Sequence, residues 1–191
     1  MTTHTPLRPD LARELLTRAH QAATRRAHRI RNELDAVQLG QSRHADYANA
    51  RVLRRIMAEH DWPGHRLVGP DAARAAWSIA LHSNDEPAVQ RAAAILLRRA
   101  AEAGDALIQH WAHLHDRVLV NSGHDQEYGT QARLRADGVE LCPLRAPQSV
   151  DERRAGVGLP PIAVALETVR RRYTPHHRAG DTLALALAEA A

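Results

Sequence analysis

The sequence has 191 residues but contains no phenylalanine and no lysine. Its aromatic residues are three Trp and three Tyr, so leucine, valine, isoleucine and alanine must form most of the core, and each Trp matters to it. All 26 basic residues are arginines, and most of them are interspersed with the 22 acidic residues. Together with the abundant alanine, this pattern is typical of a GC-rich genome and does not predict a nucleic-acid-binding surface.

Cysteine and long apolar stretches are scarce as well. The single Cys142 excludes an internal disulfide framework and a four-thiolate zinc site, which fits a reducing cytoplasm. The chain has no uncharged apolar run of about 18 residues, and its first residues, MTTHTPLRPD, lack a basic region followed by an apolar one. We therefore expect a cytoplasmic protein that does not bind membranes. No signal for an oligomeric state is present.

Glycine-rich phosphate loops are also missing. Neither GxGxxG nor GxxxxGK occurs in the sequence, so no nucleotide cofactor is indicated. We expect a protein that works without an organic cofactor.

Most of the chain has apolar residues at spacings of three and four, which predicts helices. The first begins at Pro9 and Asp10 and is expected to run to about Gln38. Further helices are predicted over residues 42–60, 70–82, 88–103, 106–120, 149–156 and 160–173. Ser149 and Glu152 fit a capping box at the start of the penultimate helix. On their helices Trp77 and Trp111 both fall on apolar stripes, so we expect both to be buried.

One strand signal interrupts this pattern. Asp137-Gly138, between residues 132–135 and 139–144, is a favoured pair for a two-residue hairpin turn. The fold class is therefore mainly all-α: a compact bundle of about six to eight helices with one small β-hairpin near residues 132–144. Length predicts a single helical domain over residues 1–174, followed by a C-terminal tail, 175–191, that is disordered or docks on the domain.

Three stretches carry a resemblance to a known family: WPGHRLVGPDAARAAWSIALHSND (62–85), DRVLVNSGHDQEYGTQ (116–131) and VDERRAGVGLPPI (150–162). They resemble a family of uncharacterised bacterial proteins, common in actinobacteria, over about residues 42–172. The resemblance implies a shared site but no named activity. The family pattern centres on the equivalents of Trp62, Trp77, His82, Asp116, Arg117, Gln126, Tyr128, Gly129, Thr130, Gln131, Asp151, Arg153 and Arg154. The histidines at 110, 113 and 115 are not part of that pattern.

The chain departs from the family pattern at several positions. Asn84 and Glu86 stand where acids are expected after the helix that ends at His82, and Arg145-Ala146 stands where an acid is expected after the hairpin. The first helix also lacks the acid–Gln pair of the family. If those acids take part in a family activity, that activity has changed or been lost in this protein.

Side chains capable of acid–base or metal chemistry are crowded into residues 110–131. His110 and His113 lie three apart on one helical face, which is the basis of a metal-site hypothesis, although no HExxH motif accompanies them. Cys142 as a nucleophile would need a histidine placed by the fold, and its Cys-Pro context favours a structural role.

The preferred hypothesis is a polar site around the loop at residues 125–131. His82 and Tyr128, with Asp116, would be the catalytic acid–base residues; the substrate-binding residues would be Arg117, Gln126, Thr130, Gln131, Arg153 and Arg154. We expect His82, Arg117, Tyr128, Gln131 and at least one of the two arginines to converge on one pocket. The same residues also fit a structural polar network that only fixes the hairpin.

Two functions follow from this site. The leading one is a small cofactor-independent enzyme acting on an anionic or peptidic substrate, such as a tailoring or hydrolytic step in actinobacterial secondary metabolism. The alternative is a non-catalytic binding module whose polar loop grips a partner protein or peptide. A pocket containing His82, Tyr128 and Arg153 would favour the enzyme, and the same residues paired flush with the surface would favour the module.

Overall fold

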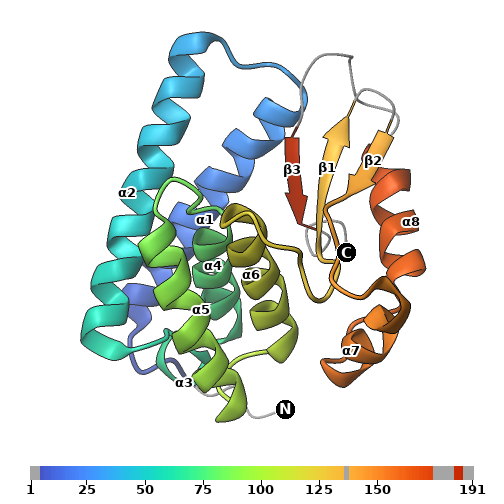
Figure 1. The fold of residues 1–191 in the computed structure, drawn as a ribbon. Coiled ribbons are helices and arrows are strands. Elements are labelled where there is room, and N and C mark those ends of the chain that lie inside the picture. Colours follow the sequence, from blue (N-terminus) through green and yellow to red (C-terminus); the bar gives the residue numbers. More distant parts are fainter. Residues whose placement is uncertain (1–4, 136–137, 174–182, 187–191) are drawn as a thin grey trace. The chain divides into compact units, whose positions relative to one another are not determined.

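The computed structural model describes residues 5–135, 138–173 and 183–186, and they group into two compact units, 1–111 and 112–191 (Figure 1). The mainly helical fold class with a small β-hairpin is confirmed. The predicted boundary of a single domain at residue 174 stays a prediction, because compactness alone does not define independent folding.

The first unit is a bundle of helices. Its elements are α1 (Pro9–Ile30), α2 (Ala36–His60), α3 (His65–Val68), α4 (Pro70–Leu81), α5 (Pro87–Glu102) and the beginning of α6 (Ile108–Asn121). In this bundle α1 packs along α4 and α2, and α5 packs against α2 and α4. Eight of the twelve residues of α4 are buried, five of them alanines, so neighbouring helices can approach it closely.

The prediction for the first helix is wrong at its end. The helix stops at Ile30, Asn32 adopts a left-handed conformation (φ 56°), and α2 begins six residues earlier than predicted. At that start Asp35 accepts the backbone N–H of Gln38, whose side chain accepts the N–H of Asp35. This capping box provides the new helix start. Apolar residues continue at helical spacing through this break, so the spacing alone predicts one uninterrupted helix.

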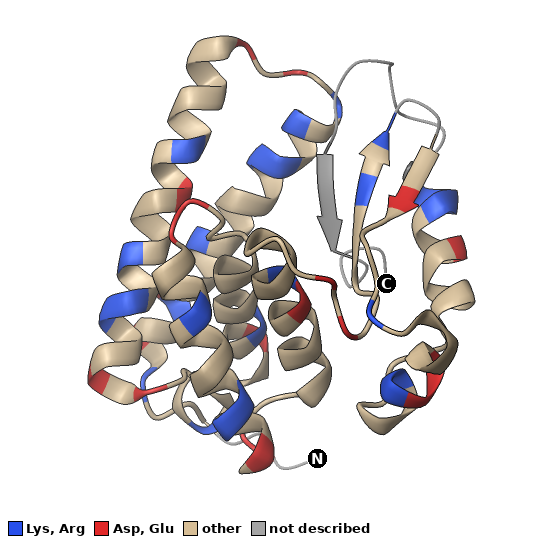
Figure 2. Cartoon of the chain, in the orientation of Figure 1, with Lys and Arg blue, Asp and Glu red and all other residues tan. Residues whose placement is uncertain are grey.

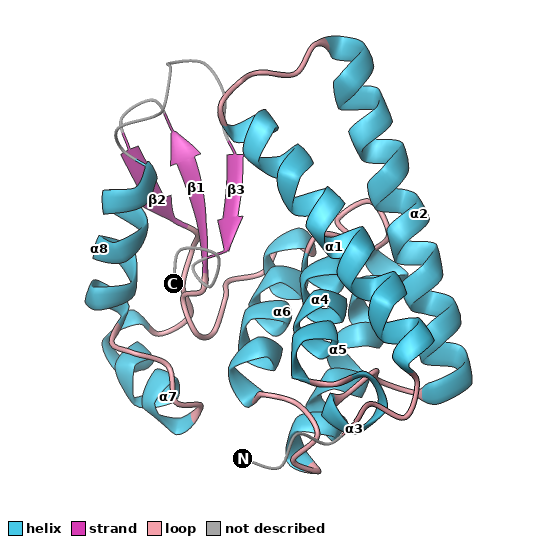
Figure 3. Cartoon of the chain, turned by 180° about the vertical axis from the view of Figure 1, so that it is seen from behind, coloured by secondary structure: helices cyan, strands magenta, loops and turns pink. Residues whose placement is uncertain are grey.

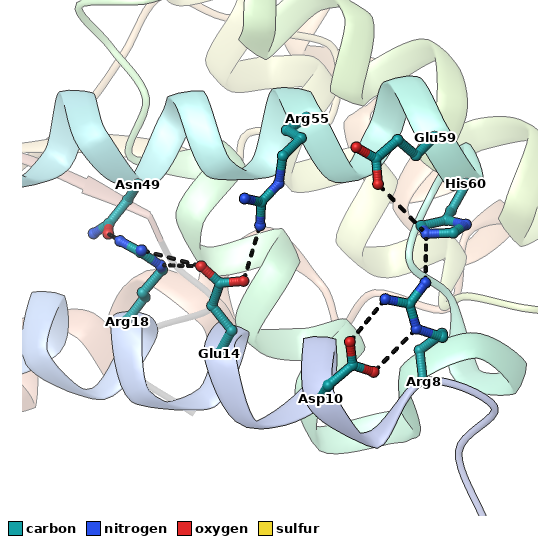
Figure 4. A network of polar contacts seen from close by, with 8 residues as sticks. All are labelled: Arg8, Asp10, Glu14, Arg18, Asn49, Arg55, Glu59 and His60. Carbon is teal, nitrogen blue, oxygen red and sulfur yellow. Dashed lines mark hydrogen bonds and ion pairs between the residues drawn. The ribbon is translucent and has the colours of Figure 1, made fainter.

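Charged side chains join α1 to α2 at two points (Figure 4). Glu14 on α1 pairs with Arg18 on the same helix and with Arg55 on α2, at 3.1 and 3.0 Å. Nearer the start of α1, Arg8 donates to Asp10 and to the Nε2 atom of His60. Figure 2 shows that acidic residues lie among the arginines of these helices, as expected from the interspersed sequence.

The second unit combines a small sheet with helices. After α6 it contains β1 (Gln131–Arg135), β2 (Gly138–Leu141), a 3₁₀ turn η1 (Pro147–Ser149), α7 (Val150–Gly156), α8 (Ile162–Tyr173) and β3 (Leu183–Ala186). The β1–β2 hairpin is antiparallel, with Arg135 opposite Gly138, and α8 lies along β2 (Figure 3). Asp137 of the predicted turn lies outside the described residues.

Part of the predicted tail forms a third strand. Residues 183–186 pair antiparallel with β1, giving the sheet order β2-β1-β3. The hairpin leaves one edge of β1 open, and a chain segment with alternating Leu and Ala can complete the backbone hydrogen bonds there. Residues 174–182 and 187–191 of the tail lie outside the described part of the chain.

A second local prediction is wrong at α7. Ser149 precedes this helix but makes no capping hydrogen bond; its hydroxyl donates to the Ala146 carbonyl and accepts a hydrogen bond from Arg153. An arginine four residues away therefore occupies the oxygen that a capping box would use.

The tryptophan predictions are confirmed. Trp77 and Trp111 are buried, with 4% and 8% of their surface exposed, and Trp62 is buried at 4% in the loop after α2. Among the described residues, no helix combines the length and apolar character needed to cross a membrane.

Candidate functional site

The turn at residues 126–131 lies in the second unit, between α6 and β1. Backbone hydrogen bonds join Gln126 to the segment after the hairpin: its N–H donates to Pro143, and its carbonyl accepts from Arg145. The sequence predicts an open polar loop here, but the backbone of its first residue is hydrogen-bonded to a segment 17 to 19 residues further along the chain.

Asp116 on α6 holds the middle of this turn. Its carboxylate is fully buried and accepts the backbone N–H groups of Glu127, Tyr128 and Thr130 and the hydroxyl of Thr130, at 2.8–3.1 Å. Burial raises the pKa of this carboxyl, and the hydrogen bonds from the turn oppose that rise. Both oxygens are occupied, so Asp116 positions the turn and has little capacity left for proton transfer.

Three of the residues predicted to bind substrate also point inward. Gln126 donates to the carbonyls of Gln131 and Cys142 and accepts the N–H of Gln131. Gln131 donates to the carbonyl of His113 and to the hydroxyl of Thr130. Gln126, Thr130 and Gln131 are each no more than 1% exposed. These side chains hydrogen-bond within the turn and to its neighbours, as expected for the structural polar network that was the alternative to a ligand site.

The two arginines of α7 hold the turn from outside. Arg154 is buried and donates to the carbonyls of Tyr128 (2.6 Å) and Pro160 (2.6 Å). Burial lowers the pKa of its guanidinium, against the influence of Asp151 and Asp116. Arg153 donates to the Glu127 carbonyl (2.7 Å) and to Ser149 and the carbonyls that precede it. Both guanidinium groups are used on the protein itself.

Gly129 meets a geometric requirement at the centre of the turn. Its φ is +64°, and a Cβ there would collide with the side chain of Ile162 at the start of α8. Glycine alone fits both the left-handed backbone and this close contact. In this chain, the positive φ and the contact with Ile162 both require a residue without a side chain at this point of the turn.

A partly exposed cluster remains on the turn: His115, Glu127, Tyr128 and Arg145. The Nε2 atom of His115 is 3.4 Å from one carboxylate oxygen of Glu127, and Arg145 donates to the other at 2.9 Å. The rings of His115 and Tyr128 meet edge to face, with centroids 6.3 Å apart. An imidazole, a carboxylate and a phenol thus lie together on a backbone that Asp116 fixes from below.

Arg145 is one of the departures from the family pattern. It stands where an acid is expected, and here it neutralises Glu127 on the side away from His115. The next residue, Ala146, has a left-handed backbone (φ 43°) that is strained for alanine. The carbonyls of both residues accept from Arg153, which stabilises this conformation.

The other predicted residues lie elsewhere. His82 is half-buried at the end of α4 in the first unit, so its convergence with Tyr128 and Arg153 in the second unit stays a prediction. Arg117 is 2% exposed beside Asp116 on α6. The two cavities described in the first unit contain neither residue.

The metal hypothesis receives no geometric support from His110, whose ring stacks on Trp77 at 4.3 Å between centroids and 9° between planes. Burial, Arg74 and His65 lower the pKa of His110 to about 4. His113 is buried, at 5% exposure. Over residues 5–135, 138–173 and 183–186, no group of three or more His, Cys, Asp or Glu side chains is placed to hold a metal ion.

Cys142 is buried at the end of the hairpin, and burial raises the pKa of its thiol. The protonated thiol is a weak nucleophile, so the geometry supports the structural interpretation of this residue.

Sequence reasoning missed His115 and Glu127. His115 lies outside the family pattern, and so does Glu127, although its neighbours Gln126 and Tyr128 belong to it. The available signal was position: each adjoins a residue that turns inward, Asp116 and Gln126, so each points in a different direction from its buried neighbour.

Comparison with known proteins adds a family but no activity. No curated protein and no solved structure matches the chain significantly. A family model matches residues 9–174, and its description is a family of unknown function. The expected resemblance to an uncharacterised family is confirmed, and the match also includes the first helix.

Proposed function

The chain belongs to the family of unknown function DUF6624, and because membership names no reaction, we propose from its side chains that it is a small acid–base enzyme. The observation that carries the proposal is the His115–Glu127 pair, 3.4 Å apart beside Tyr128, on a turn whose backbone is held by Asp116. A carboxylate beside an imidazole orients the ring. Tyr128 and His115 act as acid and base, and Asp116 positions them.

Rigidity supports this assignment. Catalytic groups need positions held by surrounding hydrogen bonds, and here buried Gln126, Thr130, Gln131 and Arg154 all bond to the turn that presents Tyr128. The substrate is anionic or peptidic. Arg145 is 71% exposed and, besides pairing with Glu127, is available to an anionic group. The proposed chemistry uses side chains only.

We place the reaction in the cytoplasm, since a chain with a single cysteine is not built around disulfide bonds. A tailoring or hydrolytic step in secondary metabolism fits this combination of a compact protein and acid–base residues. His82 remains a proposed partner of Tyr128 in the same chemistry.

Turnover of chromogenic substrates tests the proposal. The purified chain is assayed with p-nitrophenyl carboxylic and phosphate esters and with peptidyl p-nitroanilides that carry a carboxylate. We expect at least one to be hydrolysed, and Tyr128→Phe and His115→Gln each to lower kcat/KM by about 100-fold or more, the usual contribution of a general acid or base.

The exposed His124, in the same segment, supplies the matched control, since His124→Gln should leave the rate unchanged. Tyr128→Phe should also leave the free energy of unfolding nearly unchanged; a loss of about 1–3 kcal/mol would instead mark a structural hydroxyl. Equal rates in the parent, Tyr128→Phe and His115→Gln would contradict the assignment.

A second candidate function is a non-catalytic binding module. It is favoured by the observation that Arg153 and Arg154 are paired with backbone carbonyls, where they shape the turn and take no part in chemistry. Binding of the same anionic peptides without turnover by any variant would establish this module in place of the enzyme.

A further inference from the structure

A cavity of about 300 Å³ lies in the first unit. The end of α2, the loop before α3 and one side of α5 line it, and it is open to solvent. Trp62 lines it together with Leu96 and Ala100 of α5, so part of its wall is apolar. The indole N–H of Trp62 is buried and has no hydrogen-bond partner within the described ranges.

The backbone around this cavity is held in an unusual conformation. Asp61, which ends α2, has φ 60° and ψ −146°, a region that residues with a side chain rarely adopt. Gly64 lies so close to Asp105 that a Cβ there would collide with its carboxylate and carbonyl. His65 and Arg66 donate their backbone N–H groups to Asp105, at 2.9 and 2.8 Å. Strained and closely packed backbone of this kind is common around ligand sites.

Four charged side chains line the cavity, and two of them neutralise each other. The Nε atom of Arg66 lies 3.3 Å from Asp105. Arg99 and Asp61 are exposed, and within residues 5–135, 138–173 and 183–186 neither side chain has an ion-pair or hydrogen-bond partner. The cavity therefore offers one positive and one negative group beside an apolar wall.

His60 completes the lining on the α2 side. Its Nε2 atom accepts a hydrogen bond from Arg8 at 2.9 Å, which fixes the ring and leaves Nδ1 as the donor nitrogen (Figure 4). An N–H donor on the lining suits an oxygen-bearing anion better than a cation.

We propose that this cavity binds a small zwitterion with an apolar side chain, a free amino acid or a dipeptide. Its carboxylate pairs with Arg99, its ammonium group with Asp61, and its side chain packs against Trp62, Leu96 and Ala100. A simple anion would meet Asp61 and a simple cation would meet Arg99, so only a ligand with both charges satisfies the two groups. The volume is at the lower end for ligand pockets, which restricts the ligand to this size.

Calorimetric titration of the full chain tests the inference. The probes are L-leucine, L-leucyl-L-leucine, and two leucine derivatives that each lack one charge, L-leucinamide and N-acetyl-L-leucine. We expect one of the zwitterions to bind, and the derivatives to bind at least about 10-fold more weakly, because each loses one charge-assisted contact. The stronger of leucine and dileucine identifies the ligand as an amino acid or a peptide.

Variants assign the contacts. Arg99→Gln should weaken leucine binding about 10-fold and leave leucinamide binding unchanged; Asp61→Asn should weaken leucine and leave N-acetyl-leucine unchanged. Asparagine tolerates positive φ, so the second variant keeps the backbone. Arg98→Gln, on the same helix but outside the cavity, is the matched control.

Two results would overturn the inference: no heat with either zwitterion at millimolar concentration, or parental affinity in both Arg99→Gln and Asp61→Asn. Arg99 is exposed, so its variant stays folded and decides the test even if Asp61→Asn does not. The test does not use the acid–base residues, so its outcome is separate from that of the proposed enzyme activity.

Discussion

At the scale of single residues, packing decides what a histidine can do. His110 belongs to the stretch richest in reactive side chains, yet its ring lies flat on Trp77 and its pKa falls to about 4. His115, five residues later on the same helix, is partly exposed and pairs with Glu127. The same residue type therefore serves the core at one position and the candidate site at the other.

The half-buried His110, whose pKa is lowered, makes stability depend on pH. In the unfolded chain its pKa is near 6.5, so below that value the unfolded chain takes up a proton that the folded protein accepts only near pH 4. We expect the free energy of unfolding to fall by about 3 kcal/mol between pH 6.5 and pH 4 through this residue.

The measurement is urea unfolding at several pH values in the parent and in His110→Phe, which keeps a ring against Trp77 but does not titrate. Subtracting the two curves of unfolding free energy against pH cancels the contributions of the other histidines. Curves that stay parallel from pH 6.5 to pH 4 would show that folding does not lower the pKa of His110.

At the scale of elements, the turn at residues 126–131 depends on one side chain from α6. Asp116 accepts three backbone N–H groups and one hydroxyl from the turn, and Arg153 and Arg154 take its outward carbonyls. Residues 127–130, between the backbone pairing of Gln126 and the start of β1, belong to no helix or strand, so these side-chain bonds replace the regular backbone bonds that they lack.

Asp116→Asn should destabilise the protein by about 3 kcal/mol. The amide places an N–H against the N–H groups of the turn, so a buried hydrogen bond is lost and a donor is left unpaired. Asp125→Asn, an exposed acid in the same segment, is the control and should change stability by less than about 0.5 kcal/mol. Denaturant midpoints measure both, and equal midpoints would mean that Asp116 does not anchor the turn.

At the scale of the whole molecule, the lack of phenylalanine leaves few large residues for the core. All three Trp are buried, among alanines and leucines that are also largely inaccessible. The three Trp side chains fill the space that the small side chains leave. Each therefore contributes more to the stability of the core than it would in an aromatic-rich protein.

Trp77→Ala should therefore cost about 3–5 kcal/mol, since it leaves a cavity in α4 and removes the ring that His110 stacks on. Tyr47→Ala, an aromatic at 42% exposure on α2, should cost much less and serves as the control. Thermal or chemical denaturation compares the two. Similar midpoints for the Trp77 and Tyr47 variants would contradict the described core.

Most of the helices, the hairpin and the burial of the tryptophans could be predicted from the sequence, because helix periodicity, proline and glycine punctuation and turn pairs are local signals. The errors were local as well. Apolar spacing ran through the break after Ile30, and the Ser149 motif formed no capping box because Arg153 bonds to its hydroxyl.

The sequence by itself determined the mainly helical fold, the position of the polar turn and the family. Only the tertiary structure decided which polar residues of the turn point inward: Gln126 is buried while Glu127 next to it is partly exposed, and Asp116 is buried while His115 is not. The physical reason is distance along the chain. The partners of Asp116 lie 11 to 14 residues away and those of Arg153 and Arg154 up to 26, so the direction of each side chain is set by packing between elements and not by its own neighbours.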